Sequence, residues 1–170
     1  MGIVMKINMI AALVLVGFAF GGQPLIGYNY GAKNRERLKE TLKFAYLFEC
    51  GMSLVLIVAL GAFAPQLVRI FMSDPAVVEN GALMLRLQLA GMMFMGIVLI
   101  STCTFQSAGQ AVGAFLLSVS RQGVIFAIVL NVALRVAGYQ GVLASQAVSD
   151  LLTALLAVVL VVRWWKSVEF

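Results

Sequence analysis

The stretch NGALMLRLQLAGMMFMGIVLISTCTF, residues 80–105, decides the fold of this chain. It carries a single charged residue, Arg86. An α-helix rises 1.5 Å per residue, so a run of this length covers the hydrocarbon core of a bilayer, which is about 30 Å thick. The run is far too long for a strand of a membrane β-barrel, and a helix satisfies its backbone polar groups internally. The stretch therefore predicts a transmembrane helix.

Four further apolar stretches of similar length surround it. Each is flanked by polar, glycine-rich or charged residues that mark its ends. The predicted spans cover about residues 4–30, 42–64, 80–105, 112–136 and 141–163. Together they predict an all-α integral membrane protein in which residues 1–170 form one bundle of five transmembrane helices.

The composition excludes several classes of protein. Hydrophobic residues make up 62% of the chain and charged residues 11%, whereas soluble domains carry about 25% charged residues. There is no histidine, and Cys50 and Cys103 lie in apolar stretches without a metal-binding spacing, so we expect no metal site, no disulfide and no cofactor. No catalytic or phosphate-binding motif is present, and we expect no enzymatic activity.

The charged residues predict an orientation. Five basic residues fall in the short segment 31–43, and the positive-inside rule places such a segment in the cytoplasm. Alternation of the spans then places the carboxy terminus in the cytoplasm, with Arg121 near an inner turn, and Lys6 on the outer side. Since that outer amino terminus would have to be translocated without a preceding helix, we expect an upstream helix and hence a chain that is part of a larger protein.

Three polar residues inside the spans are candidates for function, because polar groups are costly in hydrocarbon. Glu49 lies about two turns into the second predicted span, where proton coupling and a partly solvated structural role both fit. Asp150 follows Ser145, Gln146 and Ser149 in the fifth span, where a wet cavity and interhelical hydrogen bonding fit equally. Asn131 in the fourth span fits an interhelical hydrogen bond.

A second group of candidates lies near helix ends and breaks. Pro24 follows Gly21 and Gly22 and predicts a kink or local unwinding near Gln23. The polar residues of these regions fit a substrate pathway, and they fit helix capping as well. Adaptable methionine side chains fit a site for greasy ligands or ordinary lipid-facing packing. The pathway candidates are Gln23, Pro24, Tyr28, Asn29, Gln106, Met92 and Met93.

Residues 20–37, FGGQPLIGYNYGAKNRER, resemble the eighth helix and the following cytoplasmic loop of the multidrug and toxic compound extrusion (MATE) family. Further similarities follow in the family's order: Pro65 to Pro75, Thr104 to Gly109, Arg121-Gln122, Gly138 to Gly141 and Ser149-Asp150. The resemblance implies helices eight to twelve of a transporter with two six-helix lobes. It also implies alternating access and export of organic, often cationic compounds in exchange for H⁺ or Na⁺.

The chain also departs from the family pattern. The seventh helix and the amino-terminal lobe are absent, and with them the coupling aspartate of the first helix, so we expect the site of the coupling ion outside this chain. The implied partners are the bilayer, drug-like molecules and the missing lobe, with no nucleic acid. Two alternatives stay open: a lipid-linked oligosaccharide flippase of the same superfamily, and a truncated membrane protein that does not transport.

Overall fold

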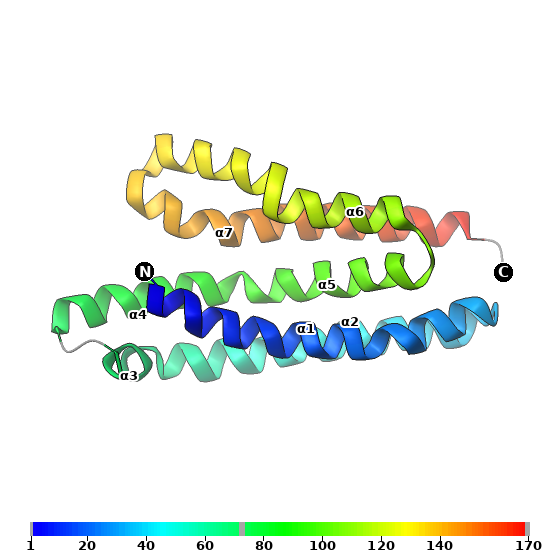
Figure 1. The fold of residues 1–170 in the computed structure, drawn as a ribbon, viewed down its shortest axis with the longest axis horizontal. Coiled ribbons are helices and arrows are strands. Elements are labelled where there is room, and N and C mark those ends of the chain that lie inside the picture. Colours follow the sequence, from blue (N-terminus) through cyan, green and yellow to red (C-terminus); the bar gives the residue numbers. More distant parts are fainter. Residues whose placement is uncertain (1, 72–73, 169–170) are drawn as a thin grey trace.

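The computed structural model describes residues 2–71 and 74–168, and its helices lie lengthwise along one elongated bundle (Figure 1). Within these residues, five helices are long and apolar enough to cross a membrane. They cover Val4–Gly31, Arg35–Ala62, Val77–Ser107, Ala111–Val136 and Ala144–Ser167. The prediction of an all-α integral membrane protein with five spans is confirmed, and the predicted boundaries agree to within a few residues at most ends.

The first two helices form a hairpin. Helix α1 (Gly2–Gly31) connects through a short loop to α2 (Arg35–Ala62), and Asn34 caps α2 by accepting a hydrogen bond from the Arg37 N–H. The second predicted span began at residue 42, which is wrong by two turns, because this cap lets the charged residues after Asn34 join the helix. Of the kink or local unwinding expected near Gln23, the unwinding is also wrong, since α1 stays helical through Pro24, and the kink stays a prediction.

The helices in the middle of the chain are interrupted between α3 and α4 and again between α4 and α5. Short helix α3 (Ala64–Arg69) precedes α4 (Pro75–Ala90) and α5 (Met92–Ser107), and the latter two make up the third span with a break at Gly91. The predicted similarity over Pro65 to Pro75 includes Met72 and Ser73, which lie outside the described residues. Helix α5 is central, since it contacts α1, α2 and α7.

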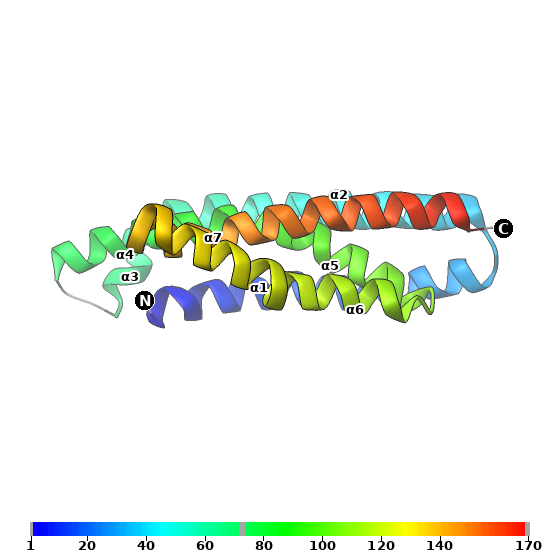
Figure 2. The same ribbon diagram turned by 90° about the horizontal axis from the view of Figure 1, so that it is seen from above.

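The last two spans form a second hairpin. Helix α6 (Ala111–Val119) continues through η1 (Ser120–Val124), a π-helical turn, into α7 (Ile125–Ser167). The chain reverses within α7 at Gly138, whose φ of 55° is readily available to glycine, so the break between the predicted spans 112–136 and 141–163 is confirmed. Figure 2 shows the same bundle from above.

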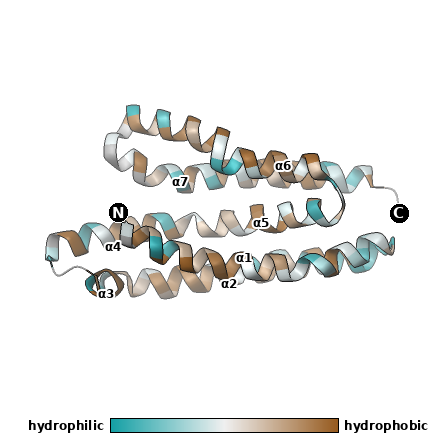
Figure 3. Ribbon diagram, viewed as in Figure 1, coloured by the Kyte–Doolittle hydropathy of each residue, from teal (hydrophilic) through white to brown (hydrophobic). Residues whose placement is uncertain are grey.

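The surface of the bundle suits a lipid environment. Large apolar side chains are exposed along every span, among them Met9, Leu47 and Val136. Figure 3 shows hydrophobic residues along most of the length of the helices. Because lipid replaces water around a membrane-spanning bundle, exposure of these apolar side chains is favourable there.

Candidate functional site

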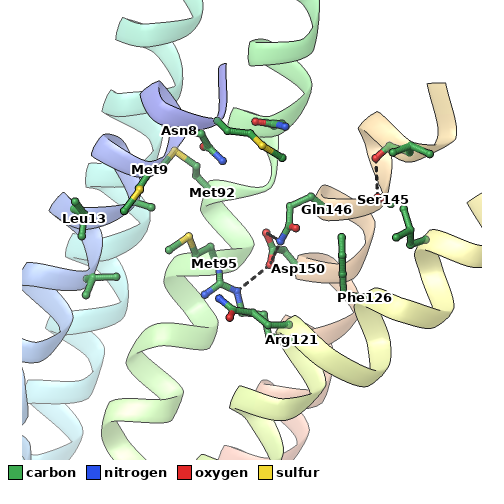
Figure 4. A pocket seen from close by; sticks show the side chains of 17 residues that line it. Asn8, Met9, Leu13, Met92, Met95, Arg121, Phe126, Ser145, Gln146 and Asp150 are labelled. Atoms are coloured by element: carbon green, nitrogen blue, oxygen red, sulfur yellow. Dashed lines mark hydrogen bonds and ion pairs between the residues drawn. The ribbon is translucent and has the colours of Figure 1, made fainter. Parts of the chain in front are cut away.

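A cavity of about 490 Å³ opens inside the bundle, in the half that holds the beginning of α1 (Figure 4). Helix α1, the junction of α4 with α5, the region of η1, and α7 form its walls. Its lining combines four methionines with a set of amide, hydroxyl and charged groups. The lining residues are Met5, Asn8, Met9, Ala12, Leu13, Val16, Gln88, Met92, Met95, Arg121, Gln122, Phe126, Leu130, Val142, Ser145, Gln146 and Asp150.

An ion pair lies in the wall of this cavity. Arg121 Nε donates to Asp150 Oδ1 at 3.0 Å, and the two side chains are 15% and 5% exposed. The side-chain amide of Gln146 lies 3.4 Å from both oxygens of Asp150. A charged group inside a membrane bundle is costly unless it is paired, so this arrangement compensates each charge with the other.

The backbone departs from regular α-helix on both sides of the ion pair. At Gly91 the N–H bonds to the Gln88 carbonyl three residues back, at 3.2 Å. A Cβ at Gly91 would lie 3.1 Å from Ala147 Cα and 3.3 Å from Asp150 Oδ2, so the missing side chain lets α7 approach closely.

Arg121 belongs to the π-helical turn η1, and the Ser149 hydroxyl donates to its carbonyl at 3.3 Å. Such π-turns occur frequently at functional sites, where they change the direction of a side chain. Two irregular turns therefore lie beside one intramembrane ion pair.

Two acceptors of the cavity lack partners. Asn8 Oδ1 and Gln88 Oε1 are buried, and neither has a hydrogen-bond partner among the described residues. Buried polar atoms are nearly always hydrogen-bonded, so an unpartnered one calls for a specific explanation. Both residues line the cavity, where a water molecule or a ligand with N–H or O–H groups would satisfy them.

The predicted pathway residues divide into two places. Met92 lines the cavity, whereas Met93 is 40% exposed and is not part of that lining. Gln23 and Gln106 meet instead near the other end of α1, where Gln23 Nε2 donates to Gln106 Oε1 at 2.6 Å. Pro24 lies with them in a shallow pocket of about 360 Å³.

The remaining residues of the second group do not line the cavity. Asn29 is buried and donates to the Leu25 carbonyl and to Thr41 Oγ1, which ties α1 to α2. Tyr28 is 74% exposed. Asn131 is exposed and donates to the Ala127 carbonyl of its own helix, at 2.8 Å. A transport role for any of these residues stays a prediction.

Glu49 lies deeper than the sequence indicated. Glu49 lies at the middle of the 28-residue helix α2, and its side chain is 0% exposed, so the partly solvated position is wrong. Neither carboxyl oxygen has a hydrogen-bond partner among the described residues. The side chain packs against Gly96, where a Cβ would lie 2.8 Å from Glu49 Cγ.

Sequence reasoning missed the other half of the ion pair. Arg121 was placed near an inner turn, but the structure puts it beside Asp150 inside the bundle, which corrects that position. The available signal was an arginine and an aspartate in two consecutive spans that fold back on each other. For Asn8 and Gln88 the available signal was the same as for Asn131, a polar side chain inside an apolar span.

Comparisons with known proteins agree on one family. The MatE family model matches residues 1–133. The chain is 29% identical over 160 residues to "Multidrug export protein MepA" of Staphylococcus aureus (strain N315), and this match covers 94% of the chain and 35% of that relative. The MepA protein of Staphylococcus haemolyticus (strain JCSC1435) is 28% identical over 165 residues. The chain thus spans about a third of the length of these relatives.

Two solved structures share the fold. One is an outward-facing conformation of a multidrug resistance MATE family transporter of the MOP superfamily, with a TM-score of 0.91 and 17% identity over 99% of this chain and 38% of that one. The other is a MATE protein in complex with MaL6, with a TM-score of 0.86 over 97% of this chain and 37% of that one, also at 17% identity. At this identity the similarity establishes the arrangement of the helices.

Proposed function

This chain belongs to the MatE family, and from that premise we propose that it supplies helices eight to twelve of a multidrug efflux transporter. In this proposal the chain forms most of the carboxy-terminal lobe, and the missing lobe is its partner. The protein exports organic, often cationic compounds by alternating access, in exchange for H⁺ or Na⁺. The names of the relatives support the export of drugs.

The observation that carries the proposal is the cavity with its ion pair. Methionines such as Met92 and Met95 provide soft, adaptable walls that accommodate apolar molecules of different shapes. The Arg121–Asp150 pair offers polar contacts in the same space, and so do the acceptors of Asn8 and Gln88, which have no partner in the part of the chain that the structure describes. A pocket of mostly apolar walls with a few placed polar groups is the usual form of a small-molecule site.

Alternating access would use the bundle as a rigid unit. Central helix α5 contacts α1, α2, α4, α6 and α7, so the lobe would move as one body while its contacts with the other lobe change. The driving force would be an ion gradient. We place the site of the coupling ion outside this chain, because Asp150 already pairs with Arg121 and the carboxyl group of Glu49 is enclosed by its neighbours.

The test is an efflux assay with the whole gene. Expression in a drug-sensitive bacterial strain should lower the accumulation of ethidium, and collapse of the proton or sodium gradient should abolish this decrease. Unchanged ethidium accumulation in cells that contain the folded wild-type protein would contradict the proposal.

A further inference from the structure

A groove of about 300 Å³ lies between α2 and the end of α7. It is formed by the first turns of α2, which follow the α1–α2 loop, and by the last turns of α7, so it lies at one end of the bundle (Figures 1 and 2). The cavity described above uses the beginning of α1 and a different part of α7. The groove is therefore a separate feature.

Three lysines line this groove. Lys39 and Lys43 come from α2, one turn apart on the same side of the helix, and Lys166 comes from the last turn of α7. All three lysines are exposed. The acidic residues of the same part of α2, Glu36 and Glu40, are not part of the lining. The groove thus presents three positive charges from two helices to a ligand.

The rest of the lining is almost entirely apolar. Val161 and Val162 of α7 face Tyr46 of α2, and the Tyr46 hydroxyl is fixed by a hydrogen bond of 2.8 Å with Ser101. Trp165, next to Lys166 in the sequence, also lines the groove, and the Arg35 guanidinium lies 5.7 Å from its ring centre. Tryptophan and basic residues at a helix end are typical of the headgroup layer of a membrane.

The two parts follow each other along the helix axis. Lys39 and Tyr46 are seven residues apart, which corresponds to about 10 Å along an α-helix. A ligand that lies along the groove therefore meets positive charge at one end and hydrocarbon at the other. This is the distribution of charge in a phospholipid whose headgroup carries a net negative charge.

We propose that this groove binds an anionic phospholipid. The headgroup phosphate contacts Lys39, Lys43 and Lys166, and an acyl chain lies against Val161 and Val162. Basic pockets between transmembrane helices at the cytoplasmic side are known to hold anionic headgroups. A soluble phosphate ion would leave the apolar floor unused, and a zwitterionic lipid would leave the three positive charges without net compensation. The site requires only that the chain crosses a membrane, so it stands independently of the transport proposal.

The test uses the whole protein, purified in detergent, and titration with phosphatidylglycerol or phosphatidylcholine followed by native mass spectrometry. Phosphatidylglycerol should bind more tightly than phosphatidylcholine. The triple variant Lys39→Gln, Lys43→Gln, Lys166→Gln should weaken phosphatidylglycerol binding by about tenfold or more, because each lysine near an anionic headgroup contributes severalfold.

The matched control is Lys33→Gln, Arg37→Gln, Arg163→Gln. Lys33 lies in the α1–α2 loop, Arg37 in the first turn of α2 and Arg163 in the last turns of α7. Together they carry the same total charge as the three lysines, but they are not part of the lining. The control should retain the wild-type preference for phosphatidylglycerol. An equal loss in both triple variants, or a wild-type protein that binds the two lipids equally, would overturn the proposal.

A second variant tests the apolar half. Val162 is 48% exposed, so Val162→Trp can extend over the groove without disturbing the core, and it should weaken phosphatidylglycerol binding while all three lysines remain. Val159→Trp serves as its control, since Val159 is 51% exposed on the same helix and is not part of the lining. If Val162→Trp binds the lipid as the wild type does, the acyl chain does not occupy the groove.

Discussion

Asp150 and Glu49 are both carboxylic acids buried in membrane-spanning helices, and the bundle treats them in opposite ways. Asp150 has Arg121 at 3.0 Å and the amide of Gln146 at 3.4 Å, and it borders a cavity. Glu49 is fully buried against Gly96, and neither of its oxygens has a hydrogen-bond partner among the described residues. One site compensates a charge and the other does not.

The comparison shows that burial of an acid inside a span does not by itself place that acid at the candidate site. An uncompensated carboxylate in an apolar interior costs far more than the uncharged acid, so the surroundings of Glu49 accommodate the uncharged form. At Asp150, by contrast, the Arg121 guanidinium lies 3.0 Å away and offers the carboxylate a counterion. Of the two acids, only Asp150 lines the cavity, where a ligand would meet it. The same kind of substitution should therefore change the stability of the protein differently at the two positions.

The largest effect is expected from Asp150→Asn. The substitution removes the negative charge and leaves the Arg121 guanidinium inside the bundle without its counterion, and loss of one partner of a buried pair costs about 3–5 kcal/mol. Thermal unfolding of the purified whole protein in detergent should show a large decrease in its midpoint. A midpoint within a degree or two of the wild type would show that Arg121 finds another partner or reaches water.

A smaller loss is expected from Gly96→Ala. The added methyl group would lie 2.8 Å from Glu49 Cγ and 3.2 Å from Ser53 Oγ, so the contact of α5 with α2 must widen. Overpacking of this kind costs about 1–3 kcal/mol. Gly51→Ala is the control, because a Cβ at Gly51 of α2 meets nothing within 4 Å. The same unfolding assay compares them, and equal midpoints for the two variants would contradict the tight packing around Glu49.

Glu49→Gln should have a still smaller effect. The amide has nearly the shape of the uncharged acid, and no ion pair is lost, so the free energy of unfolding should change by less than about 1 kcal/mol. Side by side with Asp150→Asn in the unfolding assay, it measures the difference between the two sites directly. A destabilisation as large as that of Asp150→Asn would mean that Glu49 carries a compensated charge.

The smallest effect is expected at the contact between Gln23 and Gln106, which involves no charge. A double-mutant cycle with Gln23→Ala and Gln106→Ala should give a coupling of about 0.6 kcal/mol, the average for side-chain hydrogen bonds between membrane helices. Thermal unfolding of the four proteins provides the values. A coupling above about 2 kcal/mol would contradict this expectation, because the contact would then contribute nearly as much to the free energy of unfolding as the ion pair.

The spans could be predicted from the sequence because the bilayer imposes a simple length requirement. Uninterrupted apolar stretches such as residues 80–105 are long enough to meet this requirement. The turn at Gly138 could be predicted as well, because a glycine lies there between two such stretches. The start of α2 was misplaced because the charged residues after Asn34 were assigned to a loop. Helix continues through charged residues when a cap and good helix formers are present.

The candidate site was only half predictable. Asp150 stands out in an apolar span, but its partner lies 29 residues away along the chain, and the π-turn at Ser120–Val124 that carries Arg121 has no sequence signature. The break at Gly91 was hidden for a similar reason, since a glycine in a span fits close packing as well as a break. The burial of Glu49 could not be predicted either, because it comes from packing against Gly96 of another helix, α5.

The double variant Arg121→Met, Asp150→Leu tests most directly whether the ion pair serves function or only stability. Replacement of a buried ion pair by apolar residues of similar volume is often neutral or stabilising, so the folded whole protein should unfold near the wild-type temperature. In the same preparation of cells, ethidium efflux should fall to the level of cells without the gene. A double variant that is stable and still exports ethidium at the wild-type rate would contradict a functional role for the pair.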